Sequence, residues 1–592
     1  MTNSPHIQHW LKQRQQTPCH RQLLVIAGEQ SYCQNQAQSI VEQLSLKRQI
    51  WVGNTNACEG VNPPQTSFIS AGQYHQFLGN ECDAVIYNAF DGLRANALAA
   101  LSGTLVQHGL MILLCPPLAE WPTYADPQKA QRISYGFVEL AQHSHFVSWL
   151  VRHIQADAHC ALLSAIEFTG KNKLLTPDAT LATPPYKTKE QQQAVAAIID
   201  SVNGPDSAPL IISADRGRGK SSALGIAAAQ LLQNGAQRIM VTAPLFSSTA
   251  QLFSHAQRLL DDSKQHKQAL TWMNKGIENS IEKGIDKTIE FQPVDRILAE
   301  LPSADVLLVD EAAAIPAPLL QQLCEHYSNI VFASTIHGYE GSGRGFEIRF
   351  KQYLAQHFKE YETLHIQQPI RWQADDPLEA FWFKALLLKF DLCQQPYQPQ
   401  LTLECEFISQ QQCLDDPELL AQVFSLLVNA HYQTTPDDMV RLLDAPDCRL
   451  YVLKQNESLL GAAIIHLEGG ETLSELADAI CAGERRVKGH LLAQNLGLYF
   501  NHNQWVKRRY WRIVRIAILP EHQQQGLGQQ FLQKLTELAL AQQVTLGTAF
   551  GATDKLIRFW QKAGFEIIRH GEKRDASSGT TSVIMLNNKQ TP

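Results

Sequence analysis

The sequence predicts a multidomain α/β protein, and three observations support this class. The chain has 592 residues, enough for roughly three to four domains of about 150 residues each. Short apolar runs alternate with helical stretches along most of it, which is typical of sheets covered by helices. Polar, proline-rich joins interrupt the alternation at 176–186 and at 394–399. We therefore expect three α/β domains, at residues 1–175, 176–393 and 400–592.

The composition excludes several kinds of protein. With 44% hydrophobic residues, the chain is globular rather than disordered. Its formal net charge of -7 excludes a uniformly basic nucleic-acid coat but allows a basic patch on one domain. The first residues contain no apolar leader, no apolar run is long enough to cross a membrane, and the 12 cysteines include no C-x-x-C pair. We expect a cytoplasmic, monomeric protein without a membrane segment.

The first domain alternates strands and helices in a Rossmann-like layer. We expect strands at Leu23–Ala27, Ile50–Gly53, Ala84–Tyr87 and Leu110–Cys115, and a helix at Ala95–His108. No G-x-G-x-x-G loop follows any of these strands, so no dinucleotide site is predicted. Since a fold alone does not specify a function, we expect a structural or docking role for this domain.

The second domain opens with a phosphate-binding loop. An expected strand, Leu210–Ala214, runs into a glycine-rich turn and then into the helical run Ala223–Gln233. In this context glycines let backbone N–H groups converge on the phosphates, a lysine neutralises the β and γ oxygens, and a serine hydroxyl reaches Mg²⁺. Ala214 stands where the usual pattern has its first glycine. The residues predicted to bind ATP are Asp215, Arg216, Gly217, Arg218, Gly219, Lys220, Ser221 and Ser222.

A second motif completes the nucleotide site. The apolar run Val306–Val309 ends in Asp310 and Glu311. A buried carboxylate at the end of a strand needs a partner, so we expect Asp310 to share Mg²⁺ with Ser221. Glu311 is expected to orient the attacking water. Together the two motifs predict a RecA-like P-loop ATPase core in which Lys220, Asp310 and Glu311 are catalytic.

Three further residues are candidates for the same site. Gln191 is similar to the adenine-reading glutamine of helicase-type ATPases, although it also fits a Gln-rich surface. Arg344 and Arg371 are candidate arginine fingers, and Arg344 is alternatively a contact to nucleic-acid phosphate. Too few residues separate Thr335 from the next domain break to form a second core of comparable size, so a single, helicase-like ATPase core is expected.

The third domain contains a loop for a different phosphate ligand. An expected strand, Tyr510–Leu519, leads into a Q-x-x-G-x-G loop and the amphipathic helix Phe531–Ala541. This pattern resembles the pyrophosphate loop of the GCN5-related N-acetyltransferases (GNAT). The resemblance implies that the loop amides and the helix N-terminus bind the pyrophosphate of acetyl-CoA. The loop residues are Gln523, Gln524, Gln525, Gly526, Leu527, Gly528 and Gln529.

The same resemblance assigns the strand that precedes the loop. It implies that Ile516, Ala517 and Ile518 lie beside the pantetheine arm, with an N–H near Ile518 directed at the thioester oxygen. Lys562 and Arg569 are candidates for binding the 3′-phosphate of coenzyme A. The alternative for both cations is a solvated surface.

A basic cluster lies between Glu484 and Arg515. It stands out in a chain of net charge -7, and aromatic residues alternate with its cations, so it predicts a polyanion site that stacks on unpaired bases. The alternative is that the aromatic residues fill a core and the cations face solvent. The candidates are Arg485, Arg486, Lys488, Lys507, Arg508 and Arg509, with Arg512 and Arg515 in the same cluster.

A P-loop core joined to a GNAT domain resembles one family. The segments 335–346, 368–372 and 485–492 are similar to those of the tRNA(Met) cytidine acetyltransferases, and the likeness covers nearly the whole chain. Members of that family acetylate N4 of the wobble cytidine of elongator tRNA(Met), using acetyl-CoA and hydrolysing ATP or GTP. The resemblance implies these cofactors, Mg²⁺, and tRNA bound at the basic cluster. His490 is the candidate acid or base.

The sequence departs from the bacterial pattern of this family at two points. Ala493 stands where the family has the proline of its His-Leu-Leu-Pro-Gln segment. The chain also ends soon after the expected strand Thr581–Leu586. We therefore expect the family's C-terminal tRNA-binding extension to be absent.

Two other functions fit parts of the sequence. One is an ATP-dependent nucleic-acid translocase whose acetyltransferase acts on a protein or a polyamine, which the single ATPase core disfavours. The other is an idle assembly module. The intact Lys220, Ser221, Asp310 and Glu311 disfavour that reading.

Overall fold

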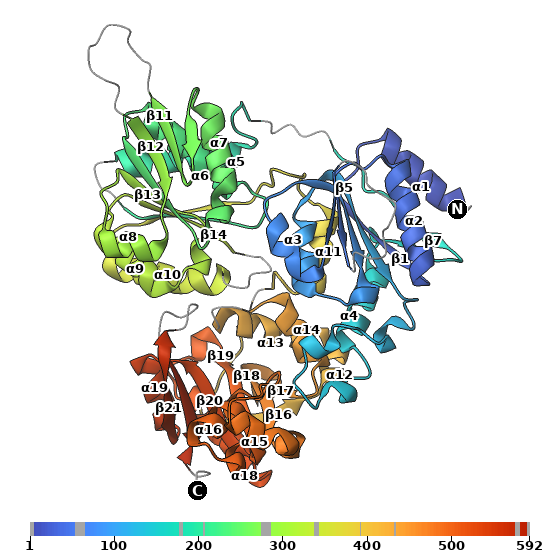
Figure 1. Cartoon of the computed structure of the whole chain (residues 1–592), viewed down its shortest axis with the longest axis vertical. Coiled ribbons are helices and arrows are strands. Elements are labelled where there is room, and N and C mark those ends of the chain that lie inside the picture. The colour runs from blue at the N-terminus through green and yellow to red at the C-terminus, as the bar shows by residue number, and fades with distance from the viewer. Residues whose placement is uncertain are drawn as a thin grey trace.

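The computed structural model has three lobes, each built on one β-sheet (Figure 1). In chain order we call them the N-terminal, central and C-terminal domains. The structure describes residues 5–53, 65–176, 182–204, 208–273, 286–336, 343–390, 392, 394–430, 434–574 and 581–588. The multidomain α/β class predicted from the sequence is confirmed.

The N-terminal domain is a seven-stranded sheet that is parallel except for its last pair, β6–β7. Its strands, in spatial order, are β3 (Thr66–Ile69), β2 (Gln49–Val52), β4 (Cys82–Asn88), β5 (Leu105–Cys115), β1 (Gln22–Ala27), β6 (Ala161–Leu163) and β7 (Phe168–Thr169). Its helices are α1 (Pro5–Gln16), α2 (Gln30–Gln43), α3 (Ala95–Ser102) and α4 (His145–Ala156).

The central domain is an eight-stranded sheet in which the strands before the P-loop and before Asp310 are completely buried. Its spatial order is β10 (Lys264–His266), β11 (Ala269–Met273), β12 (Asp286–Phe291), β9 (Arg238–Thr242), β13 (Val306–Val309), β14 (Ile330–Thr335), β8 (Leu210–Ala214) and β15 (Glu362–Ile366). One face packs on α5 (Lys189–Asn203), α6 (Lys220–Gln233) and α7 (Ala250–Leu259). The other packs on α8 (Val294–Glu300), α9 (Ala317–His326) and α10 (Gly343–His357).

The C-terminal domain is a mostly antiparallel seven-stranded sheet with one parallel pair, β19–β20. Its spatial order is β16 (Glu404–Ile408), β17 (Cys448–Gln455), β18 (Ser458–Gly469), β19 (Arg509–Ile518), β20 (Thr545–Gly551), β22 (Thr581–Asn587) and β21 (Phe565–Arg574). Its helices are α12 (Gln410–Asp415), α13 (Pro417–Ala430), α14 (Pro436–Asp444), α15 (Ala477–Cys481), α16 (Leu491–Phe500), α17 (Asn503–Lys507), α18 (Leu527–Ala541) and α19 (Asp554–Lys562). Among the described helices of the chain, none is both long and apolar enough to cross a membrane.

The helix predicted in the N-terminal domain is shorter than expected. The helix expected over Ala95–His108 ends at Ser102, and β5 already begins at Leu105. Gly103 follows the helix directly, and Leu105 pairs with Cys82 of β4. The apolar residues after Gly103 therefore continue the buried strand rather than the helix.

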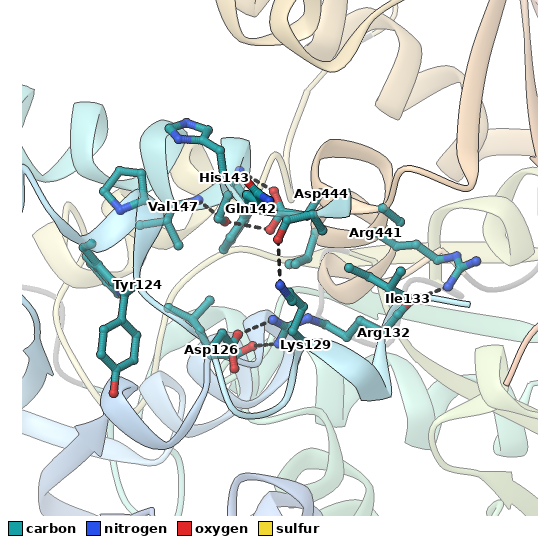
Figure 2. Close-up of a pocket in the computed structure, with 18 of the residues that line it drawn as sticks. Tyr124, Asp126, Lys129, Arg132, Ile133, Gln142, His143, Val147, Arg441 and Asp444 are labelled. Carbon is teal, nitrogen blue, oxygen red and sulfur yellow. Dashed lines mark hydrogen bonds and ion pairs between the residues drawn. The ribbon is translucent and has the colours of Figure 1, made fainter. Parts of the chain in front are cut away.

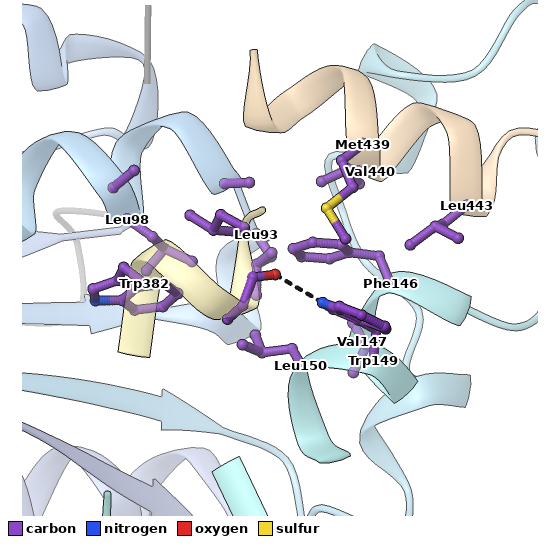
Figure 3. Close-up of a cluster of buried hydrophobic side chains, with 14 of the residues drawn as sticks. Leu93, Leu98, Phe146, Val147, Trp149, Leu150, Trp382, Met439, Val440 and Leu443 are labelled. Atoms are coloured by element: carbon purple, nitrogen blue, oxygen red, sulfur yellow. Dashed lines mark hydrogen bonds between the residues drawn. The ribbon is translucent and has the colours of Figure 1, made fainter. Parts of the chain in front are cut away.

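The N-terminal and C-terminal domains share one hydrophobic core (Figure 3). Phe146 of α4 and Val440 of α14 pack in it together with Trp382 of helix α11 (Pro377–Ala385). The Trp149 indole N–H donates to the Ala385 carbonyl at 2.7 Å, which fixes the end of α11 against α4. Although α11 follows the central domain in sequence, it is packed as part of the N-terminal domain.

A buried carboxylate also joins these two domains. Asp444, at the end of α14, accepts hydrogen bonds from the Ser144 hydroxyl at 2.6 Å and from the Phe146 N–H at 2.9 Å, at the start of α4. It lines a pocket between the domains (Figure 2). Burial raises the pKa of Asp444 to about 6, because these hydrogen bonds offset only part of the cost of removing a carboxylate from water.

We predict that Asp444→Asn removes a pH-dependent cost in stability. Since the folded pKa lies above the unfolded value of about 3.9, the folded wild type holds the proton more tightly and loses stability as pH rises from about 4 to about 6. Asparagine keeps an acceptor oxygen and carries no charge. Above pH 6 the variant should therefore be more stable, by up to roughly 3 kcal/mol, and below pH 4 the difference should vanish.

The measurement is the thermal unfolding midpoint of both proteins between pH 4 and pH 7. Asp415→Asn, on the exposed carboxylate of α12, is the matched control and should show no such trend. A difference between Asp444→Asn and wild type that does not change with pH would contradict the assignment.

Candidate functional site

The predicted P-loop joins β8 to α6. Gly217 and Gly219 have φ angles of 78° and 83°, a left-handed conformation that glycine adopts without steric cost. Gly219 caps α6, which begins at Lys220. The free N–H groups of the first turn of α6 therefore lie at the carboxyl edge of the sheet, the place where phosphate binds in this kind of loop.

Three residues from separate elements meet at this edge. The Lys220 ammonium donates to the Thr335 hydroxyl at 2.9 Å, and that hydroxyl donates to Glu311 Oε2 at 3.0 Å. Lys220 begins α6, Glu311 follows β13, and Thr335 ends β14. A cation and a carboxylate predicted to be catalytic are thus linked through one hydroxyl. This arrangement suits phosphate binding on one side and orientation of a water on the other.

Asp310, which precedes Glu311 in the chain, is completely buried. Burial, with a smaller contribution from the neighbouring Glu311, raises the pKa of Asp310 to about 7, while the Ser221 hydroxyl and the Lys220 cation act in the opposite direction. Its Oδ1 accepts the Glu311 N–H at 3.0 Å, whereas its Oδ2 has no hydrogen-bond partner among the described residues. A buried carboxylate oxygen without a partner, near a serine hydroxyl, fits the oxygen donors that Mg²⁺ prefers.

Gln191 lies against the P-loop at the start of α5. Its side chain is buried, accepts the Lys187 N–H at 2.8 Å, and approaches the Gly219 carbonyl at 3.5 Å. The structure therefore brings this predicted residue to the loop. Asp215 and Ser222, which belong to the loop itself, are also buried.

The arginine side chains of this region that the structure describes contact other parts of the protein. Arg218 forms a bidentate ion pair with Glu379 of α11, at 2.5 and 3.0 Å. Arg216 lies beside Gly103 of the N-terminal domain. The guanidinium of Arg371 donates to the carbonyls of Gly103 at 3.0 Å and Gly79 at 3.2 Å. This placement argues against Arg371 as an arginine finger. It also means that Arg216 and Arg218 can contact phosphate only through their backbone N–H groups, because their guanidinium groups bind elsewhere. The side chain of Arg344, on α10, lies outside the described part of the structure.

The C-terminal sheet opens at the predicted acetyl-CoA strand. β19 pairs with β20 only as far as Ile513 and Thr548, although β19 continues to Ile518. The register between β18 and β19 shifts just there, between Ile464 and Ile465, so β19 bends away from its parallel neighbour. Ile516, Ala517 and Ile518 therefore lie along a split between strands, where a pantetheine arm can enter.

The predicted pyrophosphate loop follows that split. Gln523, Gln524, Gln525 and Gly526 are exposed, and Leu527 begins α18 as a buried residue. Gly526 caps the helix with a φ of 85° and has open space around it. Gly528 lies close to Phe559, and Gln529 donates to the Phe559 carbonyl at 2.8 Å. An anion can therefore approach the N-terminus of α18 over Gly526.

The two cations suggested for the 3′-phosphate lie in different surroundings. Lys562 is exposed at the end of α19, the helix whose Phe559 contacts this loop. Arg569 instead donates to Asn495 at 3.0 Å and covers the Tyr499 ring at 5.4 Å. Both of these partners belong to α16, on the sheet face opposite α18. The structure does not bring Arg569 to the predicted pyrophosphate loop.

The basic cluster divides into an exposed and a paired part. Arg512 is paired with Glu468 at 2.6 Å, and Arg515 with Asp438 at 3.1 Å. Arg508 is half-buried and covers the Trp505 ring at 4.8 Å. The cations that extend into solvent are Arg485, Arg486, Lys488, Lys507 and Arg509.

Aromatic side chains of α16 and α17 lie in the same region. Tyr499 and Phe500 are 54% and 42% exposed. The Phe500 ring stacks on Trp505 with centroids 4.6 Å apart and an interplanar angle of 17°. The predicted alternative, that these aromatic residues fill a core, does not fit Tyr499 and Phe500. It does fit Tyr510 and Trp511, which are buried.

His490 has a different environment from the one expected of an acid or base. It is completely buried, its Nδ1 accepts the Gly469 N–H at 2.9 Å, and its Nε2 lies 2.9 Å from the Tyr135 carbonyl. Both ring nitrogens are therefore engaged by backbone groups, Nδ1 as acceptor and Nε2 as donor. This geometry favours a structural role, tying the C-terminal domain to the N-terminal domain.

Two residues at the nucleotide site were not singled out by motif. Glu379 reaches the P-loop from a helix 161 positions along the chain from Arg218, and no local pattern marks it. Trp372 contacts Gly217, where a Cβ atom in place of the glycine hydrogen would lie 2.4 Å from the indole ring. The only sequence signal for Trp372 was its place in the segment 368–372.

We predict that Thr335→Val slows nucleotide hydrolysis by about tenfold or more. Valine keeps the shape but removes the hydroxyl that links Lys220 to Glu311, so the two charged groups lose their common partner. Steady-state hydrolysis of ATP is the measurement. Thr363→Val, on the exposed side of β15 in the same sheet, is the control and should leave the rate unchanged. A wild-type rate in Thr335→Val would contradict the proposed linkage.

Three family models match the chain in the order of its domains. The model described as tRNA(Met) cytidine acetyltransferase TmcA, N-terminal, matches residues 1–165. The model described as RNA cytidine acetyltransferase NAT10/TcmA, helicase domain, matches residues 211–389. The model described as GNAT acetyltransferase 2 matches residues 422–545 and 532–590.

Similar curated proteins carry the name tRNA(Met) cytidine acetyltransferase TmcA. The one from Nitrosococcus halophilus is 36% identical over 96% of this chain and 75% of its own length. Those from Vibrio cholerae and Salmonella typhimurium are 36% and 32% identical, over 87% and 96% of this chain and 67% and 76% of their own lengths. The chain belongs to the tRNA(Met) cytidine acetyltransferase family.

Proposed function

We propose that this chain acetylates N4 of the wobble cytidine of elongator tRNA(Met), with acetyl-CoA as donor and with hydrolysis of ATP or GTP. Sequence similarity over 96% of the chain to a protein named tRNA(Met) cytidine acetyltransferase TmcA supports the overall reaction. The observation that carries the proposal is the split between β19 and β20, which leads to an open helix N-terminus at Gly526. That arrangement provides for an acyl donor with a pyrophosphate group.

Acetyl transfer joins the cytosine amine to the thioester carbonyl. The N4–C bond forms, the C–S bond breaks, and coenzyme A leaves as its thiol with the proton released from N4. Because the N4 lone pair is delocalised into the ring, the rate depends on alignment and on stabilising the developing oxyanion. Past Ile513, the edge of β19 is not paired with β20. Main-chain N–H groups near Ile518 would serve as oxyanion donors there.

Nucleotide hydrolysis would use the linked residues of the central domain. Lys220 would neutralise charge on the γ-phosphate, and Glu311 would orient the attacking water. Mg²⁺, when bound, would neutralise charge between the β- and γ-phosphates, with Ser221 and Asp310 as its ligands. Release of the product would change what Lys220 and Thr335 contact, and this change would drive the remodelling that exposes the target base.

tRNA would be held at the exposed part of the basic cluster. Arg485, Arg486, Lys488, Lys507 and Arg509 would contact phosphates, and the exposed rings of Tyr499 and Phe500 would stack on unpaired bases of the anticodon loop. Both kinds of group lie on or beside α16 and α17. The site therefore offers cations and stacking surfaces side by side.

The direct test is nucleoside analysis of tRNA after incubation with the protein, ATP and labelled acetyl-CoA. We expect label in N4-acetylcytidine from elongator tRNA(Met) and not from other tRNAs. Label in an added protein or polyamine, with none in tRNA, would overturn the proposal in favour of another acceptor. Omitting ATP or replacing it with GTP shows which nucleotide the reaction needs.

We predict that Gly526→Asp weakens acetyl-CoA binding at least about tenfold relative to Gly526→Asn. Both side chains have the same size and both tolerate the left-handed conformation at this position. Only aspartate places a negative charge where the pyrophosphate would bind, and it also occupies the helix N-terminus itself. Calorimetric titration with acetyl-CoA is the measurement. Equal affinities for the two variants would remove the pyrophosphate-loop assignment.

We further predict that Arg485→Ala with Arg486→Ala reduces the salt dependence of tRNA binding. Each phosphate contact contributes roughly 0.7 to 0.9 to the slope of log K against log salt, so the slope should fall by about 1 to 2 units. Affinity should fall for every tRNA alike, because phosphates carry no sequence information. Lys12→Ala with Lys47→Ala removes two exposed cations from the N-terminal domain and is the control. An unchanged slope in the Arg485, Arg486 variant would place tRNA elsewhere.

A further inference from the structure

The P-loop is held from outside the domain to which it belongs. Arg218, in the middle of the loop, is 7% exposed and makes its bidentate ion pair with Glu379 of α11. The same guanidinium donates to the Gln367 carbonyl at 3.0 Å and to the Arg216 carbonyl at 2.9 Å. A largely buried bidentate pair of this kind fixes both partners in direction as well as in distance. The position of the loop therefore depends on the position of α11.

A tryptophan supports the loop next to this pair. Trp372 packs directly against Gly217, so closely that even a methyl group at Gly217 would collide with the indole ring. The indole N–H is 3.4 Å from Glu379 Oε2, and the neighbouring Ile370 N–H donates to the Gly217 carbonyl at 2.9 Å. A movement of Gly217 toward this side requires Trp372 to move as well.

Trp372 in turn rests on the N-terminal domain. The Arg21 guanidinium lies 3.4 Å from the centroid of its ring. Arg21 pairs with Asp376 at 2.8 Å, and these side chains are only 1% and 0% exposed. Asp376 caps α11 by accepting the Glu379 N–H at 2.9 Å. The P-loop is thus connected through Trp372 to Arg21, which directly precedes β1 of the N-terminal sheet.

We propose that the N-terminal domain and α11 position the P-loop, and that Trp372 and Glu379 are the positioning residues through which they do so. Both side chains contact the loop itself, Trp372 at Gly217 and Glu379 at Arg218. They act by fixing Gly217 and Arg218. These two residues lie within the loop whose backbone N–H groups would bind phosphate. The proposal rests on nucleotide hydrolysis at Lys220, as proposed above. It gives the N-terminal domain a part in hydrolysis, although that domain has no nucleotide motif of its own.

The test compares Glu379→Gln, Trp372→Ala and Trp372→Phe in the full chain. Glutamine keeps the size of Glu379 but cannot pair with both nitrogens of Arg218 as a charged partner. Because a displacement of about 1 Å at a phosphate site can cost about 100-fold, we expect kcat for ATP hydrolysis to fall about 10- to 100-fold in Glu379→Gln and Trp372→Ala. Trp372→Phe retains a ring against Gly217 and Arg21 and should recover most of the rate.

An ion pair within the central domain serves as the control. Arg238 pairs with Glu290 at the opposite, amino-terminal end of the central sheet. Glu290→Gln should leave both kcat and KM for ATP unchanged. Thermal unfolding of every variant, and hydrolysis measured well below each unfolding midpoint, separate a loss of rate from a loss of folded protein.

The outcomes distinguish the inference from the proposed function. If Glu379→Gln and Trp372→Ala lower only the unfolding midpoint and hydrolyse ATP at the wild-type rate when folded, the two residues are structural and the inference is wrong. If Trp372→Phe is as slow as Trp372→Ala, the ring contact is not what positions the loop. If the wild-type chain hydrolyses no nucleotide and Lys220→Ala therefore changes nothing, it is the proposed function that fails.

Discussion

The burial of α11 constrains both the domain interface and the nucleotide site. The helix lies in the core that the N-terminal and C-terminal domains share, and the loop just before it touches the P-loop. Its first turn is fixed by the Arg21–Asp376 pair, from which water is excluded. Removing one partner of such a pair leaves an unpaired buried charge, at a cost of about 3–5 kcal/mol. The nucleotide site and the domain interface therefore depend on the same buried contacts.

The parts that could be predicted from the sequence are those fixed by local patterns. The strands Leu210–Ala214 and Val306–Val309 were expected with the bounds that they have, since a short apolar run before a glycine-rich or acidic turn defines a buried parallel strand. Topology then brings the ends of such strands to one sheet edge. That is why Lys220 and Glu311, predicted from separate motifs, lie on either side of Thr335.

The parts that could not be predicted depend on partners far away in the chain. The P-loop motif includes Arg216 and Arg218 but does not predict the direction of these long side chains. In the structure Arg218 pairs with Glu379, and Arg216 lies beside Gly103. His490 raised the expectation of proton transfer because histidine titrates near neutral pH. Only the tertiary structure reveals that Gly469 and Tyr135 occupy both of its ring nitrogens.

These misplaced expectations share one physical explanation, which concerns the N-terminal domain. Buried polar groups near a functional motif here bond to a neighbouring domain. Leaving a buried polar group without a hydrogen-bond partner costs free energy, and the neighbouring domain supplies the partner. Arg371 bonds to Gly79 and Gly103, and His490 to Tyr135, all on the N-terminal domain. That domain was expected to be structural or a docking unit. It contacts both the ATPase loop and the C-terminal domain. A rearrangement of either one therefore changes contacts made by the N-terminal domain.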